Sequence, residues 1–245
     1  MRVAVVTAAV PFLGGPQTWT RLAEALPPGD TIDVVDPLDA SAGDAYVSLV
    51  RAITGALAAG ADVLVAHGGA LRPSLDALAK YHRDVPLVAL APIYAGGSVS
   101  ISTNVTNWVL GSRPGSMLLA RFAKRYYERM RESTADRVRS QLEILVRDDA
   151  IDAALVAEAS ARLADPRTVA RAERIASFVR ADTVPIPPEL LAAAPRRVAL
   201  VGEGTRTRRS RANLIDDDWT IIEVNGDAPM LEDPFAVVRA IRSFS

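Results

Sequence analysis

Cysteine is absent from the 245-residue sequence, and histidine occurs only twice, as His67 and His82. Without cysteine the chain has no disulfide bond, no thiol nucleophile and no thiolate metal ligand. Because zinc sites draw their ligands mainly from cysteine and histidine, we expect no metal site. We also expect no cofactor, since Gly202-Glu203-Gly204 does not complete the glycine pattern of a dinucleotide-binding turn.

The sequence also lacks a charge excess and a long apolar run. Its formal net charge is −1 at pH 7, whereas nucleic-acid-binding domains usually carry a basic surface. No apolar stretch reaches the length that spans a bilayer, and the strand-like run Val3–Val6 follows Met1 without a signal-peptide pattern. We therefore expect a cytoplasmic protein with neither nucleic acid nor membrane as a partner. No pattern predicts an oligomeric state.

Short apolar runs alternate with helical patterns in the first part of the chain and again near its end. This alternation is typical of a parallel sheet with crossover helices. The expected strands are Val3–Ala8, Thr31–Val35, Asp62–Ala66, Leu87–Leu90, Arg197–Val201 and Trp219–Val224. The expected helices are Pro16–Ala25, Ala45–Ala59, Pro73–Tyr81 and Pro234–Phe244. The last helix has Asp233 as its expected N-cap and a proline at its first position.

Between these two parts the strand pattern stops and apolar residues recur at helical spacing. We predict that residues 98–194 form a helical cap, inserted into a core made of residues 1–97 and 195–245. Thr134 is the predicted N-cap of one cap helix, and Asp165-Pro166 opens another. The apolar stripes of the cap either pack against the sheet or form a lid that lines a pocket, and a lid must also pack.

Four segments carry a recognisable pattern. Val10–Gly15 follows the first expected strand, and Leu64–Ala70, which reads LVAHGGA, joins the third strand to a helix. Leu200–Glu203 and Gly226–Pro234 come near the end of the chain. In this order they resemble the oxyanion loop, nucleophile elbow, acid-bearing strand and histidine loop of the α/β-hydrolase superfamily. The resemblance implies an α/β-hydrolase fold, a mostly parallel sheet flanked by helices with a helical cap insertion.

The same resemblance shows which reactive groups this chain lacks. Gly68 stands where the family has its nucleophilic serine, and Asp227 stands where it has its histidine. The central residue of the elbow adopts a positive φ, which glycine does without strain. Of the two histidines, His67 lies beside the elbow and His82 just before a strand, so neither is placed as the late-chain base. Because loss of such a relay lowers rates by orders of magnitude, we do not expect hydrolysis of ordinary esters or amides.

The feature that this resemblance leaves intact is a cradle for a carbonyl group. The backbone N–H groups of Phe12 or Leu13 and of Gly69 are placed to bind a carbonyl oxygen. Such donors stabilise an enolate as well as a tetrahedral oxyanion, so proton transfer beside a carbonyl needs no nucleophile. It does need a base, which is Asp227 or a group of the substrate. The alternative role of Asp227 is that of a turn residue or a helix cap.

A narrower resemblance follows from Gly68, Asp227, the short N-terminal part and the cap. In these the chain is similar to the triad-less group represented by the bottromycin peptide epimerase. The resemblance implies an isomerase of antibiotic biosynthesis that acts on a ribosomally made, modified peptide. In that group a peptidyl L-aspartate next to a thiazoline is converted to the D form with help from the substrate's own carboxylate.

No catalytic residue is assigned. The residues expected to bind the substrate are Phe12, Leu13, Gly68, Gly69, Tyr94, Trp108, Phe122, Tyr126, Asp227 and Met230. For the aromatic residues and the methionine, packing in the core is an equal alternative. Two other functions remain open. One is a pseudo-hydrolase that binds a hydrophobic peptide, a small molecule or a partner protein, and the other is a cyclase or lyase that uses the same oxyanion donors.

Overall fold

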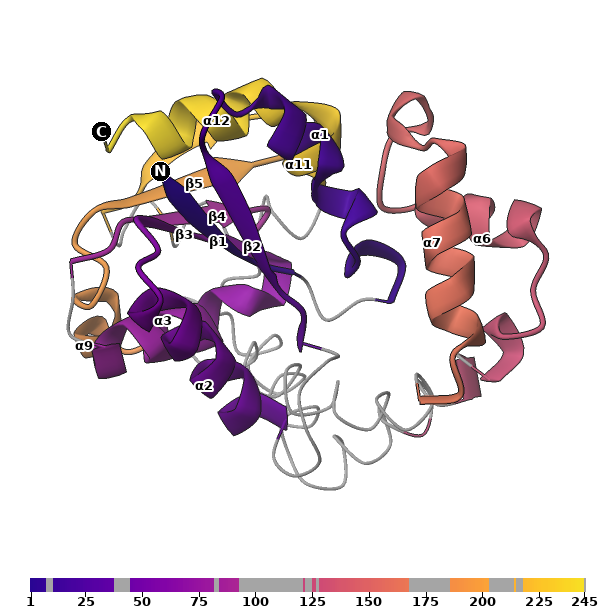
Figure 1. The fold of residues 1–245 in the computed structure, drawn as a ribbon, viewed down its shortest axis with the longest axis horizontal. Coiled ribbons are helices and arrows are strands. Elements are labelled where there is room, and N and C mark those ends of the chain that lie inside the picture. Colours follow the sequence, from indigo (N-terminus) through magenta and orange to yellow (C-terminus); the bar gives the residue numbers. More distant parts are fainter. Residues whose placement is uncertain are drawn as a thin grey trace, which may run out of the picture.

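The computed structural model of the protein contains a parallel sheet of six strands. It describes residues 1–7, 11–37, 45–81, 84–92, 121, 125–126, 128–167, 186–202, 214 and 218–244. The strand order is β2-β1-β3-β4-β5-β6, as Figure 1 shows in part. The strands are β1 (Arg2–Val6), β2 (Thr31–Val35), β3 (Val63–His67), β4 (Leu87–Leu90), β5 (Arg197–Val201) and β6 (Thr220–Glu223). All six expected strands are confirmed, with small shifts at their ends.

Burial explains why the central strands have continuous apolar sequences. Every residue of β3 and β4 is buried, because helices cover both faces of the sheet. The edge strands β2 and β6 contain only exposed and half-buried residues. Neighbouring strands are aligned so that Val6 lies beside Ala66, which places the carboxyl ends of β1 and β3 side by side.

The helices form a layer on each face of the sheet (Figure 1). On one face lie α1 (Gln17–Ala25), α11 (Pro229–Glu232) and α12 (Pro234–Arg242), which share an apolar cluster with Val3 and Val5. On the other face lie α2 (Ala45–Ala58), α3 (Leu71–Tyr81) and α9 (Pro188–Leu191), packed with Ala4 and Val6. The predicted cap at Asp233 is confirmed, since its carboxylate accepts a hydrogen bond from the backbone N–H of Ala236.

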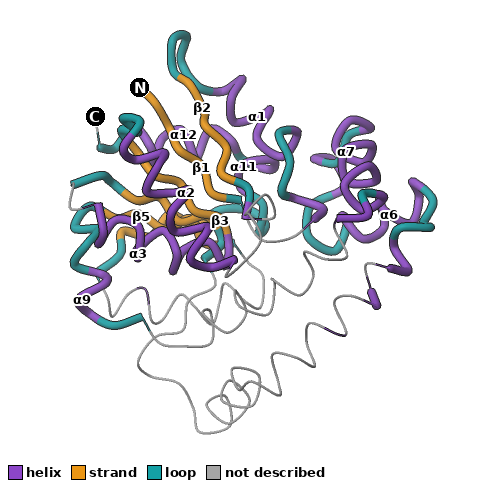
Figure 2. Tube along the Cα trace, turned by 60° about the horizontal axis from the view of Figure 1, so that its bottom comes forward, coloured by secondary structure: helices purple, strands orange, loops and turns teal. Residues whose placement is uncertain are grey.

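Helices α6 (Ala135–Leu142) and α7 (Ala153–Ala164), joined through the turn η4 (Asp148–Ala150), lie beside α1 rather than over the middle of the sheet (Figure 2). Thr134 caps α6, as predicted, by accepting from the N–H of Arg137 at 3.4 Å. The buried side chains of both helices belong to the same apolar cluster as those of α1. The helix predicted after Asp165-Pro166 and the cap boundary at residue 98 fall at or beyond the edge of the described residues, so the extent of the cap stays a prediction.

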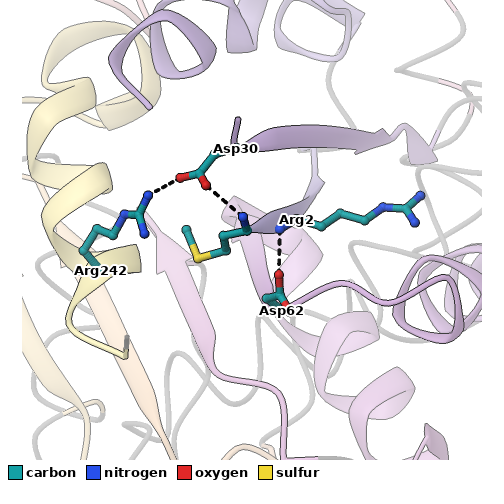
Figure 3. Close-up of polar contacts among 5 residues, drawn as sticks. Arg2, Asp30, Asp62 and Arg242 are labelled. Atoms are coloured by element: carbon teal, nitrogen blue, oxygen red, sulfur yellow. Dashed lines mark hydrogen bonds and ion pairs between the residues drawn. The ribbon is translucent and has the colours of Figure 1, made fainter. Parts of the chain in front are cut away.

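A group of ionic contacts ties the amino ends of the strands to the last helix (Figure 3). The ammonium group of Met1 donates to Asp30 at 2.8 Å, and the Arg242 guanidinium pairs with the same carboxylate. The backbone N–H of Arg2 donates to Asp62 at 2.7 Å. The ammonium group and Arg242 hold the pKa of Asp30 below its usual value, although burial opposes the shift. These contacts lie at the end of the sheet opposite the site described below.

Candidate functional site

The order of the strands indicates where a ligand binds. From β1 the chain crosses to β2 on one side and then returns to β3 on the other, so the direction of winding changes between β1 and β3. In open α/β sheets, ligands bind in the crevice outside the carboxyl ends of strands at such a switch point. By this rule a ligand would bind between the turn η1 (Pro11–Leu13), which follows β1, and the turn η3 (Gly68–Ala70), which follows β3, and we refer to this region as the crevice.

The turn after β3 is a sharp strand-to-helix connection. His67 still has an extended backbone, with φ −100°, whereas Gly68 has φ +57°. This is the positive φ expected of the central residue of the turn. Leu71 begins α3 immediately afterwards, and its backbone N–H donates to the carbonyl of Gly68. A strand-to-helix turn of this kind exposes the side chain of its central residue, but Gly68 has no side-chain atom.

Across the crevice, η1 is held by apolar packing. Phe12 and Leu13 are 6% and 3% exposed, in the cluster that also contains the buried side chains of α7. The ring of Phe12 meets that of Tyr126 edge to face, with centroids 6.4 Å apart and planes at 67°. The hydroxyl of Tyr126 donates to Gln141 at 2.6 Å, and burial raises its pKa. The structure therefore brings together Phe12, Leu13 and Tyr126 among the predicted site residues.

His67 links the turn after β3 to the loop after β6. Its Nε2 lies 3.3 Å from the backbone carbonyl oxygen of Asp227, so the tautomer protonated at Nε2 donates to that carbonyl. Burial lowers the pKa of the imidazole to about 4, although the hydrogen bond and the charge of Asp227 oppose this shift. His67 is consequently neutral at pH 7, and its buried Nδ1 has no hydrogen-bond partner among the described residues. Thr7 follows Val6 at the end of β1, next to the end of β3. Its buried hydroxyl also has no hydrogen-bond partner among the described residues.

The loop after β6 lies directly against the carboxyl end of β5. A Cβ atom added at Gly202 would be 1.9 Å from the carbonyl oxygen of Gly226 and 2.8 Å from Oδ1 of Asp227. Gly226 itself has φ +96°, which favours glycine. Glu232 then accepts from the backbone N–H of Ala228 at 3.0 Å. The loop thus places Asp227 near the ends of β3 and β5, beside the crevice.

The other predicted site residues are placed less directly. Met230 is fully buried on α11 and packs in the same cluster as Trp19 and Leu22 of α1, so its pocket-lining role stays a prediction. Gly69 lies in η3 beside Gly68 and is partly exposed. Three predicted site residues and one histidine lie outside the described residues, namely Tyr94, Trp108, Phe122 and His82.

Sequence reasoning missed Glu158 and Arg162, two charged residues on the side of α7 that faces the core. The carboxylate of Glu158 accepts from the backbone N–H of Gln17 at 2.6 Å, just after η1. Arg162 pairs with Asp36 at 2.6 Å, just after β2. A signal existed, because each charge lies three positions after a buried residue of that helix, Glu158 after Leu155 and Arg162 after Ala159.

Other features of the described part of the chain bear on ligand classes. Its histidine, aspartate and glutamate side chains form no group of three that is suited to hold a metal ion. None of its helices combines the length and apolarity needed to cross a membrane. A cavity of about 460 Å³ lies at the amino ends of β4 and β5, away from the crevice, between α3, Asp84 and α9.

Comparison with solved structures identifies the fold. The hydrolase olei00960 from Oleispira antarctica aligns with a TM-score of 0.63 and 13% identity, covering 99% of this chain and 90% of that one. An α/β-hydrolase-fold protein from Burkholderia ambifaria aligns with a TM-score of 0.56 and 16% identity, and the alignment covers 99% of this chain and 89% of that one. NosK from Streptomyces actuosus aligns with a TM-score of 0.57 and 14% identity, and the alignment covers 99% of this chain and 96% of that one.

The protein therefore has the α/β-hydrolase fold, as the sequence predicted. No family model and no curated protein matches the sequence.

Proposed function

We propose that the protein is a non-hydrolytic enzyme, an isomerase that epimerises an L-aspartate within a modified natural-product peptide. One observation carries the proposal. Gly68 adopts φ +57° at a turn that in a hydrolase presents the attacking side chain, and it has no oxygen to present. Acyl transfer through a covalent intermediate therefore has no nucleophile at this position.

The remaining groups suit proton transfer at a carbon next to a carbonyl. The α C–H bond breaks, the proton passes to a base, and the electron pair moves onto the carbonyl oxygen as an enolate. The backbone N–H groups of Phe12 or Leu13 and of Gly69 then stabilise the oxygen. Return of a proton to the opposite face of the carbon gives the D residue, so the reaction consumes no second reactant.

The base in this proposal is a carboxylate. The β-carboxylate of the substrate aspartate is one source, and Asp227 is the other, since its loop lies at the end of β5 beside the crevice. His67 supports this arrangement indirectly, because its imidazole donates to the backbone carbonyl of Asp227. A neutral imidazole in that position fixes the loop without adding a positive charge next to the carboxylate.

The exposed side of Tyr126 supports a peptide as the substrate. This side chain is 39% exposed although its ring contacts Phe12. An aromatic surface of this kind offers a large contact area at a low cost in side-chain entropy. Tyr94, Trp108 and Phe122 are proposed to extend it.

The test is hydrogen exchange at the substrate α-carbon in deuterium oxide. A peptide carrying L-aspartate beside a thiazoline is incubated with the protein, and its mass and the ratio of L to D residues are followed. The proposal predicts enzyme-dependent gain of one deuterium together with the D epimer. The same peptide with asparagine in place of aspartate separates the two bases, because its exchange slows only if the substrate carboxylate is the base. Tight binding without exchange would instead indicate a pseudo-hydrolase, and ring closure or cleavage would indicate a cyclase or lyase.

A further inference from the structure

Helix α7 packs against the segment η1 at one side of the crevice. Leu155, Ala159 and Leu163 are buried on one side of this helix, in the apolar cluster that contains Phe12 and Leu13. The segment η1 is thereby packed against α7 along its apolar face. Glu158 lies three positions after Leu155, and residues at that spacing share one side of a helix, so Glu158 lies beside the apolar side of α7.

The carboxylate of Glu158 provides the cap that α1 lacks in its own sequence. Pro16 occupies the N-cap position and has no side-chain group that can accept a hydrogen bond, and the first turn of α1 contains no acidic residue. The backbone N–H groups of a first helical turn have no partner within the helix and attract negative charge. Here the N–H of Gln17 donates to Glu158, a residue 141 positions away, at 2.6 Å.

Glycine at position 15 makes room for this contact. A Cβ atom at Gly15 would be only 1.7 Å from Oε1 of Glu158, so the carboxylate occupies the space of the missing side chain. Gly14 and Gly15 connect η1 to α1, and two successive glycines leave the backbone there with wide conformational freedom. A fixed point immediately after them restricts where η1 lies.

A second contact fastens the same helix to the sheet. Arg162, one turn after Glu158, pairs with Asp36 at 2.6 Å, and the Asp36 side chain is 6% exposed. Asp36 follows β2, so α7 is tied to the carboxyl ends of two neighbouring strands, β1 through its loop and β2 directly. These two contacts fix the position of α7 on this side of the crevice.

From these contacts we infer that Glu158 is a positioning residue, which sets the location of the Phe12 and Leu13 backbone N–H groups through its hydrogen bond to Gln17. Its effect on a reaction rests on the proposed function, whereas its effect on the loop does not. The two are therefore tested by separate measurements.

Amide hydrogen exchange tests the effect on the loop. Glu158→Ala removes the acceptor and Glu158→Asp withdraws it by one methylene, whereas Glu158→Gln keeps an acceptor oxygen at the same length. We expect exchange at Gln17 to accelerate about tenfold or more in the Ala and Asp variants and to stay within about threefold in the Gln variant, as local opening requires. Glu143→Ala is the matched control, because Glu143 pairs with Arg139 on α6 and does not touch the loop. Unprotected Gln17 in the unaltered protein, or unchanged exchange in both the Ala and Asp variants, would overturn the inference.

Kinetics of α-carbon exchange test the effect on the reaction. Misplacement of oxyanion donors lowers turnover more than substrate binding, so kcat of Glu158→Ala should fall by about tenfold to 100-fold with little change in KM. The kcat of Glu158→Gln should stay close to that of the unaltered protein. If the Ala and Gln variants are folded to the same extent, a purely structural role of Glu158 predicts the same kcat for both. An equal kcat in all variants despite faster Gln17 exchange would overturn the role in the reaction. If no peptide shows exchange with the unaltered protein, the proposed function fails, and the amide measurement still decides whether Glu158 anchors the loop.

Discussion

The imidazole of His67 donates from Nε2 to the backbone carbonyl of Asp227 across 3.3 Å and joins the last residue of β3 to a loop 160 residues later in the sequence. The contact brings the last strand of the chain to the turn after β3. Because it is buried, it also makes the stability of the fold depend on the protonation of one imidazole.

The stability of the protein should fall on mild acidification because of His67. Its folded-state pKa of about 4 lies below the ordinary value, so the unfolded chain binds the proton more readily. The stabilising contribution is complete above the unfolded pKa and is lost as the pH falls toward the folded pKa. Between pH 7 and pH 4.5 we expect a loss of about 2 kcal/mol from this residue. Urea unfolding of the unaltered protein and of His67→Gln, which keeps a donor but does not titrate, measures the difference. Parallel pH profiles would contradict the account.

The positive φ of Gly68 predicts a cost for any side chain at this position. Gly68→Ala should lower the free energy of unfolding by about 1–2 kcal/mol, because an L residue is strained in the left-handed region. Gly55→Ala is the matched control, since Gly55 lies within α2 with open space around its missing Cβ. That change should stabilise the protein by about 0.5–1 kcal/mol through helix propensity. Equal effects of the two substitutions in urea unfolding would argue against the strand-to-helix turn.

The close approach of Gly202 and Gly226 predicts that a methyl group at residue 202 displaces the loop after β6. Gly202→Ala should cost about 1–3 kcal/mol, because the new atom would overlap the Gly226 carbonyl. Displacement of the loop would expose His67, and its pKa should rise toward the ordinary value. An NMR titration of the His67 ring follows this shift. A pKa that stays near 4 in a folded Gly202→Ala protein would show that the loop does not shield the imidazole.

The Asp30 carboxylate predicts a second, separate pH dependence at the other end of the sheet. Its pKa is held below the ordinary value by the ammonium group of Met1, which is the largest contribution, and by Arg242. Its stabilising effect is therefore present above the unfolded pKa of an aspartate and lost as the pH falls through the lower folded pKa. Asp30→Asn should lower the melting temperature at pH 6 and have a smaller effect at pH 3, below the ordinary pKa of an aspartate. Asp84→Asn, which breaks an exposed pair with Arg196, should change it little at either pH.

The central strands were readable from the sequence because they are buried on both faces. Leu87–Leu90 and Arg197–Val201 are short apolar runs next to turn residues, and the structure places strands at those same residues. The order of the strands was not readable, since it depends on contacts between distant segments. The positive φ at Gly68 followed from the resemblance of the turn and not from periodicity.

The contacts around the site were harder to predict. His67 binds a backbone carbonyl and Glu158 binds a backbone N–H. Because every residue type has a backbone carbonyl and nearly all have a backbone N–H, the sequence does not indicate which of these groups a side chain binds. Met230 followed an apolar pattern that serves a core as well as a pocket, and here the side chain is fully buried. Only charges on the core-facing side of a helix, as at Arg162, give a warning of this kind of contact.

The central claim is that the turn after β3 retains the shape of a nucleophile elbow but holds no attacking atom. The most direct test is the intact mass of the protein after incubation with a fluorophosphonate probe, with a serine hydrolase in the same tube as a positive control. The account predicts that the mass of this protein stays unchanged while the control gains one adduct. A single stable adduct on a serine or threonine of the crevice would contradict it.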